Sequence, residues 1–185
     1  AGGGHPGRWR GSGRDDKRGG GMAMVLRGLW QIATSRGGVR PVRNLAERWR
    51  GWREDTVAQA RHWPDSGLVS EGLRVLHELA KPLPTDTLLA TDLHAGNVLR
   101  SERQPWLVID PKPFIGDVAF DLVQHLHVCE KRLQADPIGM VRRLADLAEV
   151  DAERLQLWTF ARAAAEPRSA WNNPVWMDIA RALAQ

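Results

Sequence analysis

Apolar residues recur three or four positions apart through most of this chain, which is the spacing of helices that bury one face. The pattern predicts helices over residues 22–34, 44–63, 68–80, 118–133, 136–148, 151–165 and 174–183. Residues typical of helix N-caps precede five of these helices, namely Asn44, Asp65 or Ser66, Asp117, Asp136 and Asp151. Trp49, Trp52 and Trp63 continue the apolar stripe of residues 44–63, and such a stripe is typical of a buried core.

Strand-like patterns are few. Two short apolar runs, residues 87–90 and 106–109, are each followed by an aspartate, Asp92 and Asp110. We expect residues 97–100 to pair with 106–109 through a turn at residues 101–105. The predicted fold class is therefore mainly α, with one small β-hairpin that carries the candidate chemistry.

Asp92, Asn97 and Asp110 follow one another at spacings of five and thirteen residues. Phosphoryl-transfer enzymes have this layout, in which a catalytic loop precedes a metal-binding aspartate. A carboxylate at Asp92 can accept a hydroxyl proton, and oxygens of Asn97 and Asp110 suit Mg²⁺. Each residue alone is more typical of a turn, so the hypothesis depends on the joint spacing.

The segments TDLHAGNVL, VIDPKPFIGDVAFDL and WTFARAAAEP resemble the aminoglycoside phosphotransferase family, in its branch of streptomycin and hydroxyurea kinases. The likeness extends over roughly residues 22–185 and implies a kinase-like large, C-terminal lobe. It also implies ATP as co-substrate, Asp92 as the catalytic base, and Asn97 and Asp110 as the ligands of Mg²⁺. Asp121 matches a family position that supports the catalytic loop from below.

Two further positions lie close to the base in sequence. His94 lies in the catalytic loop, where it could order the loop by hydrogen bonding or contact phosphate. Many family members have a histidine two residues before the base, but this chain has Ala90 there, which puts the rigidity of the loop in doubt.

The resemblance implies an acceptor with an alcohol group, an aminoglycoside such as streptomycin, and hence antibiotic resistance. A polycationic acceptor needs carboxylates around it, and the sequence offers Asp117, Glu130, Glu166 and Asp178 without showing which converge. Asp117 is the more typical helix cap. The residues that bind nucleotide and acceptor are left open, and Lys112 has no assigned role because the family places its nucleotide lysine in the N-terminal lobe.

We find no glycine-rich loop on a strand and no strand lysine, the parts that hold phosphates in a kinase N-terminal lobe. The expectation is that this lobe is absent, and that the chain alone is weakly active or inactive. The expected organisation is a disordered Gly/Arg-rich leader over residues 1–21, with nine glycines, followed by a kinase-like C-terminal lobe over residues 22–185.

Charge changes this picture little. The net charge is +4, but residues 1–21 hold five Lys or Arg and two Asp, which leaves +1 for the rest of the chain. A basic tail on a nearly neutral body argues against nucleic acid as the main partner. Cys129 is the only cysteine, which suits a reducing cytoplasm, and no apolar run is long enough to predict a membrane span. The sequence does not indicate an oligomeric state.

Two other functions compete with the kinase hypothesis. The chain could be a non-catalytic kinase-lobe fragment or a binding scaffold. The segment DLHAGN also loosely imitates binuclear metallophosphoesterases, but those enzymes need more ligands on a strand-rich fold than this sequence predicts.

Overall fold

The computed structural model describes residues 24–30, 45–99, 107–169, 171 and 173–184. The predicted leader at residues 1–21, the Asn44 cap and the turn at 101–105 lie outside these residues. Residues 24–30 are helical. The further helices are α2 (Leu45–Ala58), α3 (Ser66–Leu79), α4 (Val118–Val128), α5 (Glu130–Ala135), α6 (Pro137–Ala148), α7 (Ala152–Ala165) and α8 (Val175–Leu183), and the 3₁₀ turns are η1 (Ala60–His62) and η2 (Ala95–Asn97).

Four predicted N-caps are confirmed by hydrogen bonds from backbone N–H groups of the first helical turn. Asp65 accepts from Leu68 at 3.0 Å. Asp117, Asp136 and Asp151 accept in the same way from Ala119, Gly139 and Arg154. The helix predicted over residues 118–133 is in fact two helices, because the backbone turns out of the helical conformation at Cys129. A break of one residue leaves the apolar spacing nearly unchanged, so the sequence does not reveal it.

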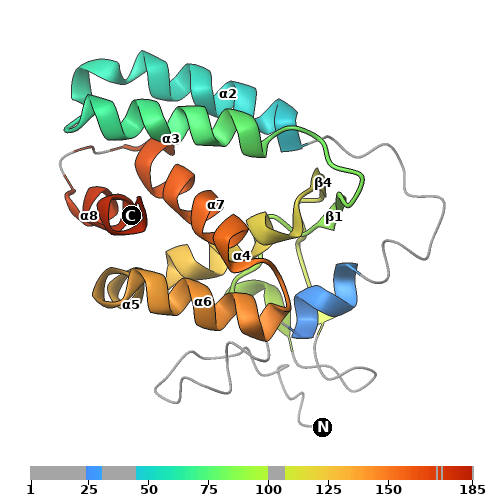
Figure 1. Ribbon diagram of the computed structural model, residues 1–185. Coiled ribbons are helices and arrows are strands. Elements are labelled where there is room, and N and C mark those ends of the chain that lie inside the picture. The colour runs from blue at the N-terminus through green and yellow to red at the C-terminus, as the bar shows by residue number, and fades with distance from the viewer. Residues whose placement is uncertain (1–23, 31–44, 100–106, 170, 172, 185) are drawn as a thin grey trace, which may run out of the picture.

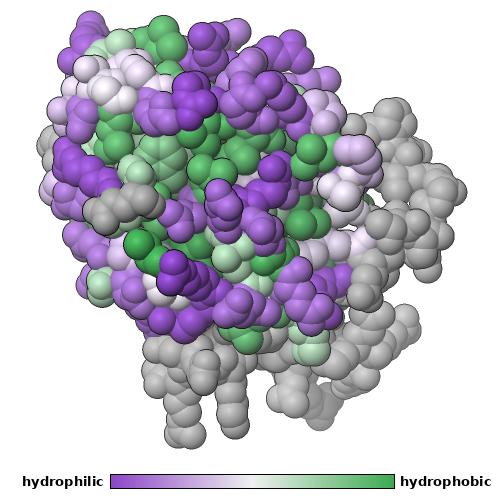
Figure 2. Space-filling view, in the orientation of Figure 1, coloured by the Kyte–Doolittle hydropathy of each residue, from purple (hydrophilic) through white to green (hydrophobic). Residues whose placement is uncertain are grey.

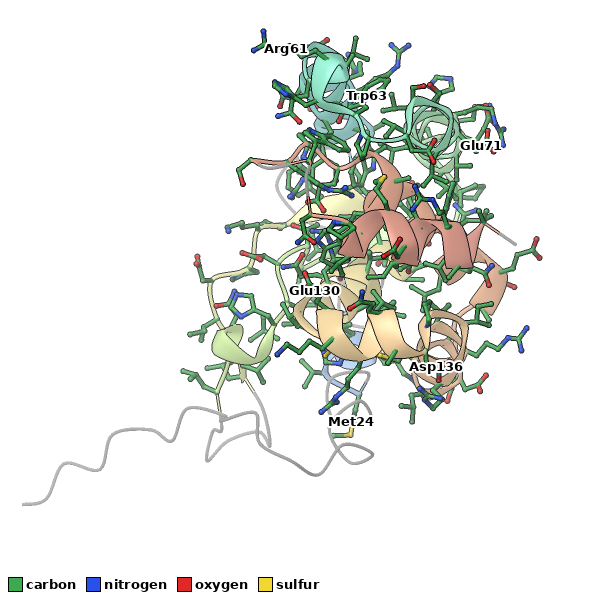
Figure 3. The ribbon with its side chains drawn as sticks, turned by 90° about the vertical axis from the view of Figure 1, so that its left-hand side faces the viewer. Met24, Arg61, Trp63, Glu71, Glu130 and Asp136 are labelled. Carbon is green, nitrogen blue, oxygen red and sulfur yellow. The ribbon has the colours of Figure 1, made fainter. Side chains whose placement is uncertain are left out.

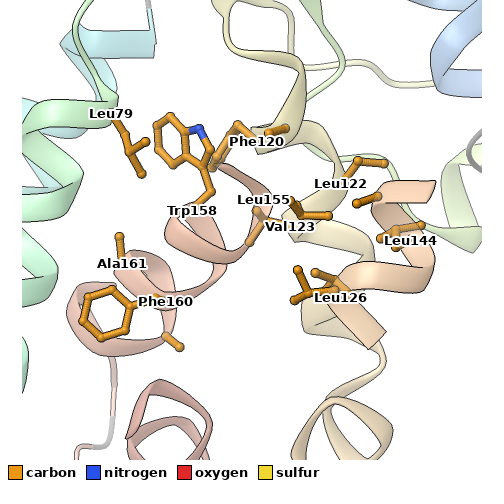
Figure 4. Close-up of a cluster of buried hydrophobic side chains, with 14 of the residues drawn as sticks. Leu79, Phe120, Leu122, Val123, Leu126, Leu144, Leu155, Trp158, Phe160 and Ala161 are labelled. Atoms are coloured by element: carbon orange, nitrogen blue, oxygen red, sulfur yellow. The ribbon is translucent and has the colours of Figure 1, made fainter. Parts of the chain in front are cut away.

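Helix α7 runs through the middle of the molecule, with α2 and α3 packed above it in Figure 1 and α5 and α6 below it. Its side chains are buried around most of the helix, including Trp158, Phe160 and Ala161. Figure 4 shows Trp158 between Leu79 of α3 and Phe120 of α4, and Leu155 on the other side of α7 beside Val123 of α4. The core is therefore a layered helical packing with α7 as its centre.

The tryptophans of α2 show how this packing extends. Trp49 is 3% exposed and its ring centroid lies 5.4 Å from that of Trp158, so the prediction of a core tryptophan is confirmed there. Trp63 is half-buried at the junction of α2 and α3, near Arg61 in Figure 3, and its indole N–H donates to the carbonyl of Thr56 at 3.1 Å.

The prediction of a single hairpin is wrong, because the described residues form two small antiparallel sheets. The predicted pair exists as β2 (Val98–Leu99) with β3 (Leu107–Val108). The second sheet joins β1 (Thr87–Leu89) to β4 (Phe114–Gly116). The sequence PKPFIGD around β4 has the composition of a turn, and only its pairing with β1 makes it a strand.

Figure 2 shows polar side chains over most of one face, with hydrophobic side chains visible between them. Among the described helices, none has the length and apolar character that a bilayer crossing requires.

Candidate functional site

The structure brings two loops of the candidate site together beside the two small sheets. Asp92 lies three residues after β1, and Asn97 is the last residue of η2. The side-chain amide of Asn97 donates to the carbonyl oxygen of Asp92 at 3.0 Å, and the carbonyl oxygen of Asn97 accepts from the N–H of Ile109 at 2.9 Å. Asn97 is therefore bonded both to Asp92 and to the residue directly before Asp110.

Two residues in these loops have left-handed backbone conformations that side chains disfavour. Thr91 has φ of 53° and Asp110 has φ of 50°. Such a conformation costs about 1–2 kcal/mol for a residue with a side chain. At Thr91 the surroundings hold it, since its N–H donates to Asp121 at 2.7 Å and its hydroxyl donates to the carbonyl oxygen of Lys112 at 2.5 Å. Strained residues held in this way are common at functional sites.

Asp121 lies on α4 beneath the loop that leads to Asp92 and is 1% exposed. Its carboxylate accepts three N–H groups: the backbone N–H of Ala90 at 2.9 Å, that of Thr91, and the indole N–H of Trp30 at 3.2 Å. Burial raises the pKa of Asp121 to about 6, and the three hydrogen bonds oppose this change. Asp121 thus connects α4 and the helical residues 24–30 to the start of the loop.

His94 orders the turn that carries Asn97. Its Nδ1 accepts from the N–H of Gly96 at 3.0 Å, which caps η2. Of the two roles considered for His94, ordering the loop and contacting phosphate, this hydrogen bond agrees with the first.

The carboxylate of Asp92 has two side-chain neighbours that sequence reasoning missed. Lys112 Nζ lies 2.5 Å from Oδ2, and Gln124 Nε2 lies 3.4 Å from Oδ1. The side chain of Asp92 is 23% exposed and that of Lys112 58% exposed. The hydrogen bond and charge of Asp92, followed by the charge of Asp110, raise the pKa of Lys112. The only signal for Lys112 in the sequence is its position two residues after Asp110.

The donor atoms suit Mg²⁺. The side-chain amide nitrogen of Asn97 donates to the carbonyl oxygen of Asp92, so it is the amide oxygen of Asn97 that can bind a metal ion. Asp110 is exposed on the neighbouring loop. In the described part of the chain, no three His, Cys, Asp or Glu side chains cluster as a metal site. A few oxygen donors, with water and substrate phosphates completing the shell, are typical of Mg²⁺ rather than of a closed protein cage.

The four carboxylates expected near an acceptor have different surroundings. Asp117 is buried and binds Arg154 Nε and the indole of Trp158, each at 2.5 Å, so it is a structural group. Asp178 pairs with Arg181 at 3.1 Å on α8, and Glu130 begins α5, where Figure 3 labels it. These three do not converge on Asp92 through any contact among the described residues.

Glu166 is the carboxylate of the four with a connection to Asp92. It accepts from Arg162 Nε at 2.9 Å and Nη2 at 3.1 Å, and His127 Nδ1 lies 3.5 Å away. Burial and the charge of Arg162 lower the pKa of Arg48, while the carboxylates of Glu166 and Asp92 act in the opposite direction. Arg48 therefore lies within electrostatic reach of both carboxylates.

Comparison with known proteins decides the family. The profile of the aminoglycoside/hydroxyurea antibiotic resistance kinases matches residues 12–175. The chain belongs to this family. The resemblance stated from TDLHAGNVL and VIDPKPFIGDVAFDL is thereby confirmed, and the family's kinases are phosphotransferases. Neither this match nor the mainly helical fold supports the metallophosphoesterase alternative.

Three relatives of this chain carry names that agree with the family. A streptomycin 6-kinase of Streptomyces glaucescens is 33% identical over 181 residues, which cover 91% of this chain and 58% of that protein. A hydroxyurea phosphotransferase of Kitasatospora aureofaciens is 36% identical over 142 residues, 75% of this chain and 41% of that protein. A streptomycin 6-kinase of Streptomyces griseus is 46% identical over 85 residues, 43% of this chain and 28% of that protein.

The chain thus spans at most 58% of the length of these relatives. No solved structure matches it.

Proposed function

We propose that this chain is the kinase-like large lobe of a phosphotransferase, which transfers the γ-phosphoryl group of ATP to an alcohol group of a small molecule such as streptomycin. Membership of the family supports the reaction class. The observation that carries the proposal is the hydrogen bond from the side-chain amide of Asn97 to the backbone carbonyl of Asp92. A second hydrogen bond joins the backbone of Asn97 to Ile109, the residue directly before Asp110. This arrangement supports a proton acceptor at Asp92 near oxygen donors for a metal at Asn97 and Asp110.

Asp92 is the proposed base. Its carboxylate accepts the proton of the acceptor hydroxyl while that oxygen forms a bond to the γ-phosphorus. The bond from the γ-phosphorus to the β–γ bridging oxygen breaks, and ADP leaves. Asp121 and His94 are the proposed loop supports, because they hold the backbone on either side of Asp92.

Asn97 and Asp110 are the proposed ligands of Mg²⁺, which when bound would neutralise charge on the phosphates. The N–H of Ile109, the residue before Asp110, donates to the carbonyl oxygen of Asn97 at 2.9 Å, so the backbone segments that carry the two proposed ligands are adjacent. Lys112 lies within the electrostatic reach of Asp110 and in contact with Asp92, which agrees with one shared site.

The acceptor is proposed from the names of two kinds of relatives. Two are streptomycin 6-kinases and one is a hydroxyurea phosphotransferase, so both compounds belong in the assay.

The test is transfer of ³²P from [γ-³²P]ATP to streptomycin or hydroxyurea by the purified chain, at enzyme concentrations high enough to detect slow turnover. Asp92→Asn should abolish transfer, because an amide cannot accept the hydroxyl proton. Asp146→Asn is the matched control, since Asp146 is exposed on α6. Mg²⁺-dependent transfer that survives Asp92→Asn would contradict the assignment of the base.

Metal binding gives a second readout that does not need turnover. Mn²⁺ can replace Mg²⁺ and be titrated by electron paramagnetic resonance. Asn97→Ala and Asp110→Ala should each weaken binding, and Asp146→Asn should not. Unchanged binding in both site variants contradicts the proposed ligands, and in that case a non-catalytic scaffold becomes the better description.

A further inference from the structure

We propose that Lys112 is a positioning residue for Asp92: its ammonium group holds one carboxylate oxygen so that the other faces the acceptor hydroxyl. The inference rests on the proposed function. It assigns a role to a residue that the known parts of a kinase site do not use, because Lys112 lies on the metal loop rather than in a nucleotide-binding lobe.

Lys112 is bonded to three consecutive residues of the catalytic loop. Its N–H donates to the carbonyl oxygen of Ala90 at 3.1 Å, and its carbonyl oxygen accepts from the hydroxyl of Thr91 at 2.5 Å. Its side chain then reaches Asp92. The metal loop is therefore fastened to the catalytic loop at Lys112, two residues beyond Asp110.

The two oxygens of the Asp92 carboxylate are bound unequally. Oδ2 lies 2.5 Å from the Lys112 ammonium, in direct charge-assisted contact. Oδ1 has Gln124 Nε2 at 3.4 Å, which is long for a hydrogen bond. Oδ1 is thus the oxygen more readily available to accept a proton from a hydroxyl, and Lys112 determines which oxygen that is.

This contact is not needed to hold the fold. An exposed ion pair contributes little to stability, typically about 0–1 kcal/mol. Asp121 holds the N–H groups of Ala90 and Thr91 from the opposite side, and the two backbone bonds of Lys112 do not involve its ammonium group. Replacing the side chain alone therefore removes the charge beside Asp92 while leaving the attachment between the loops in place.

The kinetic test compares Lys112→Met and Lys112→Arg with Lys131→Met, a matched control because Lys131 is exposed on α5. Lys112→Met should lower kcat on the order of 10²-fold, the lower end of what a positioned base contributes, with both KM values little changed. Lys112→Arg should recover part of the loss, since a guanidinium also donates to a carboxylate. Lys131→Met should behave as the wild type.

A chemical readout tests the contact itself without turnover. The chain has four lysines, so labelling with limiting acetic anhydride can be followed at each by mass spectrometry. Lys112 should react more slowly than Lys131 in the wild type, because its amino group is held in contact with the Asp92 carboxylate. In Asp92→Asn, labelling of Lys112 should accelerate while that of Lys131 stays the same.

The outcomes separate the two proposals. The role of Lys112 alone is overturned if Asp92→Asn loses phosphoryl transfer while Lys112→Met retains it in full. Equal labelling of Lys112 and Lys131 in both the wild type and Asp92→Asn overturns it as well. A wild-type chain that neither transfers phosphate nor binds Mn²⁺ through Asn97 and Asp110 contradicts the proposed function, and the inference on Lys112 falls with it.

Discussion

The core around α7 and the loops around Asp92 are held together by different forces. In the core, side chains such as Trp158 and Phe120 are fully buried, and their ring centroids lie 5.4 Å apart at an interplanar angle of 61°. In the loops, strands of two or three residues meet, and a few hydrogen bonds made by Asp121, by Asn97 and by the backbone of Lys112 determine the backbone path.

This difference has a consequence for substitutions. Core stability is spread over many weak contacts, so a lost side chain lowers the free energy of unfolding of the whole domain. The loops depend on a few polar groups, so a lost group should disturb the site more than the domain. The four substitutions below test this contrast, from the largest expected effect to the smallest.

Trp158→Ala should have the largest effect. It leaves a cavity at the centre of the core and removes the indole donor to Asp117, so we expect a loss of about 3–5 kcal/mol in the free energy of unfolding. Urea denaturation followed by circular dichroism measures it. Trp158→Phe, which keeps a ring but not the N–H, should lose less. If Trp158→Ala lowered the free energy of unfolding by less than Asp121→Asn or His94→Ala does, the contrast between core and loops would be wrong.

Asp121→Asn should cost about 2–3 kcal/mol, because an amide nitrogen must face at least one of the three N–H donors now bound by the carboxylate. The pH dependence has a defined sign. The folded-state pKa of Asp121, about 6, exceeds its ordinary value of 3.8, so its contribution to stability is fully present below about pH 4 and is lost as pH rises through 6.

The difference in unfolding free energy between wild type and Asp121→Asn should therefore shrink as the pH rises from 4 to 7. Denaturation curves at several pH values measure this difference directly, and other titrating groups cancel in it. If this difference in unfolding free energy stays constant from pH 4 to 7, the side chain of Asp121 does not titrate in that range.

Gly72→Ala tests how closely the core helices approach. A Cβ at position 72 would lie 2.6 Å from Cβ of Ala164 and 3.1 Å from that of Ala165, so α3 and α7 must separate. We expect a loss of about 1–2 kcal/mol by overpacking. Gly67→Ala is the control, because its nearest neighbour is 3.6 Å away. Equal losses in both variants would place the cause in helix propensity rather than in packing.

His94→Ala should have the smallest effect on stability, about 0.5–1.5 kcal/mol, because it removes one hydrogen bond to the N–H of Gly96. Amide hydrogen exchange should show faster exchange at Gly96 and unchanged exchange in α7. Faster exchange across α7 as well would mean that loop and core unfold together.

The sequence predicted the helical part of this protein well, for a physical reason. Helix positions and caps depend on residues within one or two turns, so Asp65, Asp136 and Asp151 could be assigned from their neighbours alone. The β1–β4 sheet was missed because it depends on pairing between residues about 27 positions apart, as Thr87 with Gly116 and Leu89 with Phe114 show.

The candidate site divides in the same way. The sequence was enough to predict the family and to single out Asp92, Asn97 and Asp110, because the residues of these motifs lie close together in the chain. Only the tertiary structure showed that Lys112 and Gln124 contact Asp92, and that Asp117 is occupied by Arg154 and Trp158. These contacts join residues 20 to 41 positions apart. Local sequence determines which elements form, but the partner of a charged side chain is decided by which elements the buried core brings side by side.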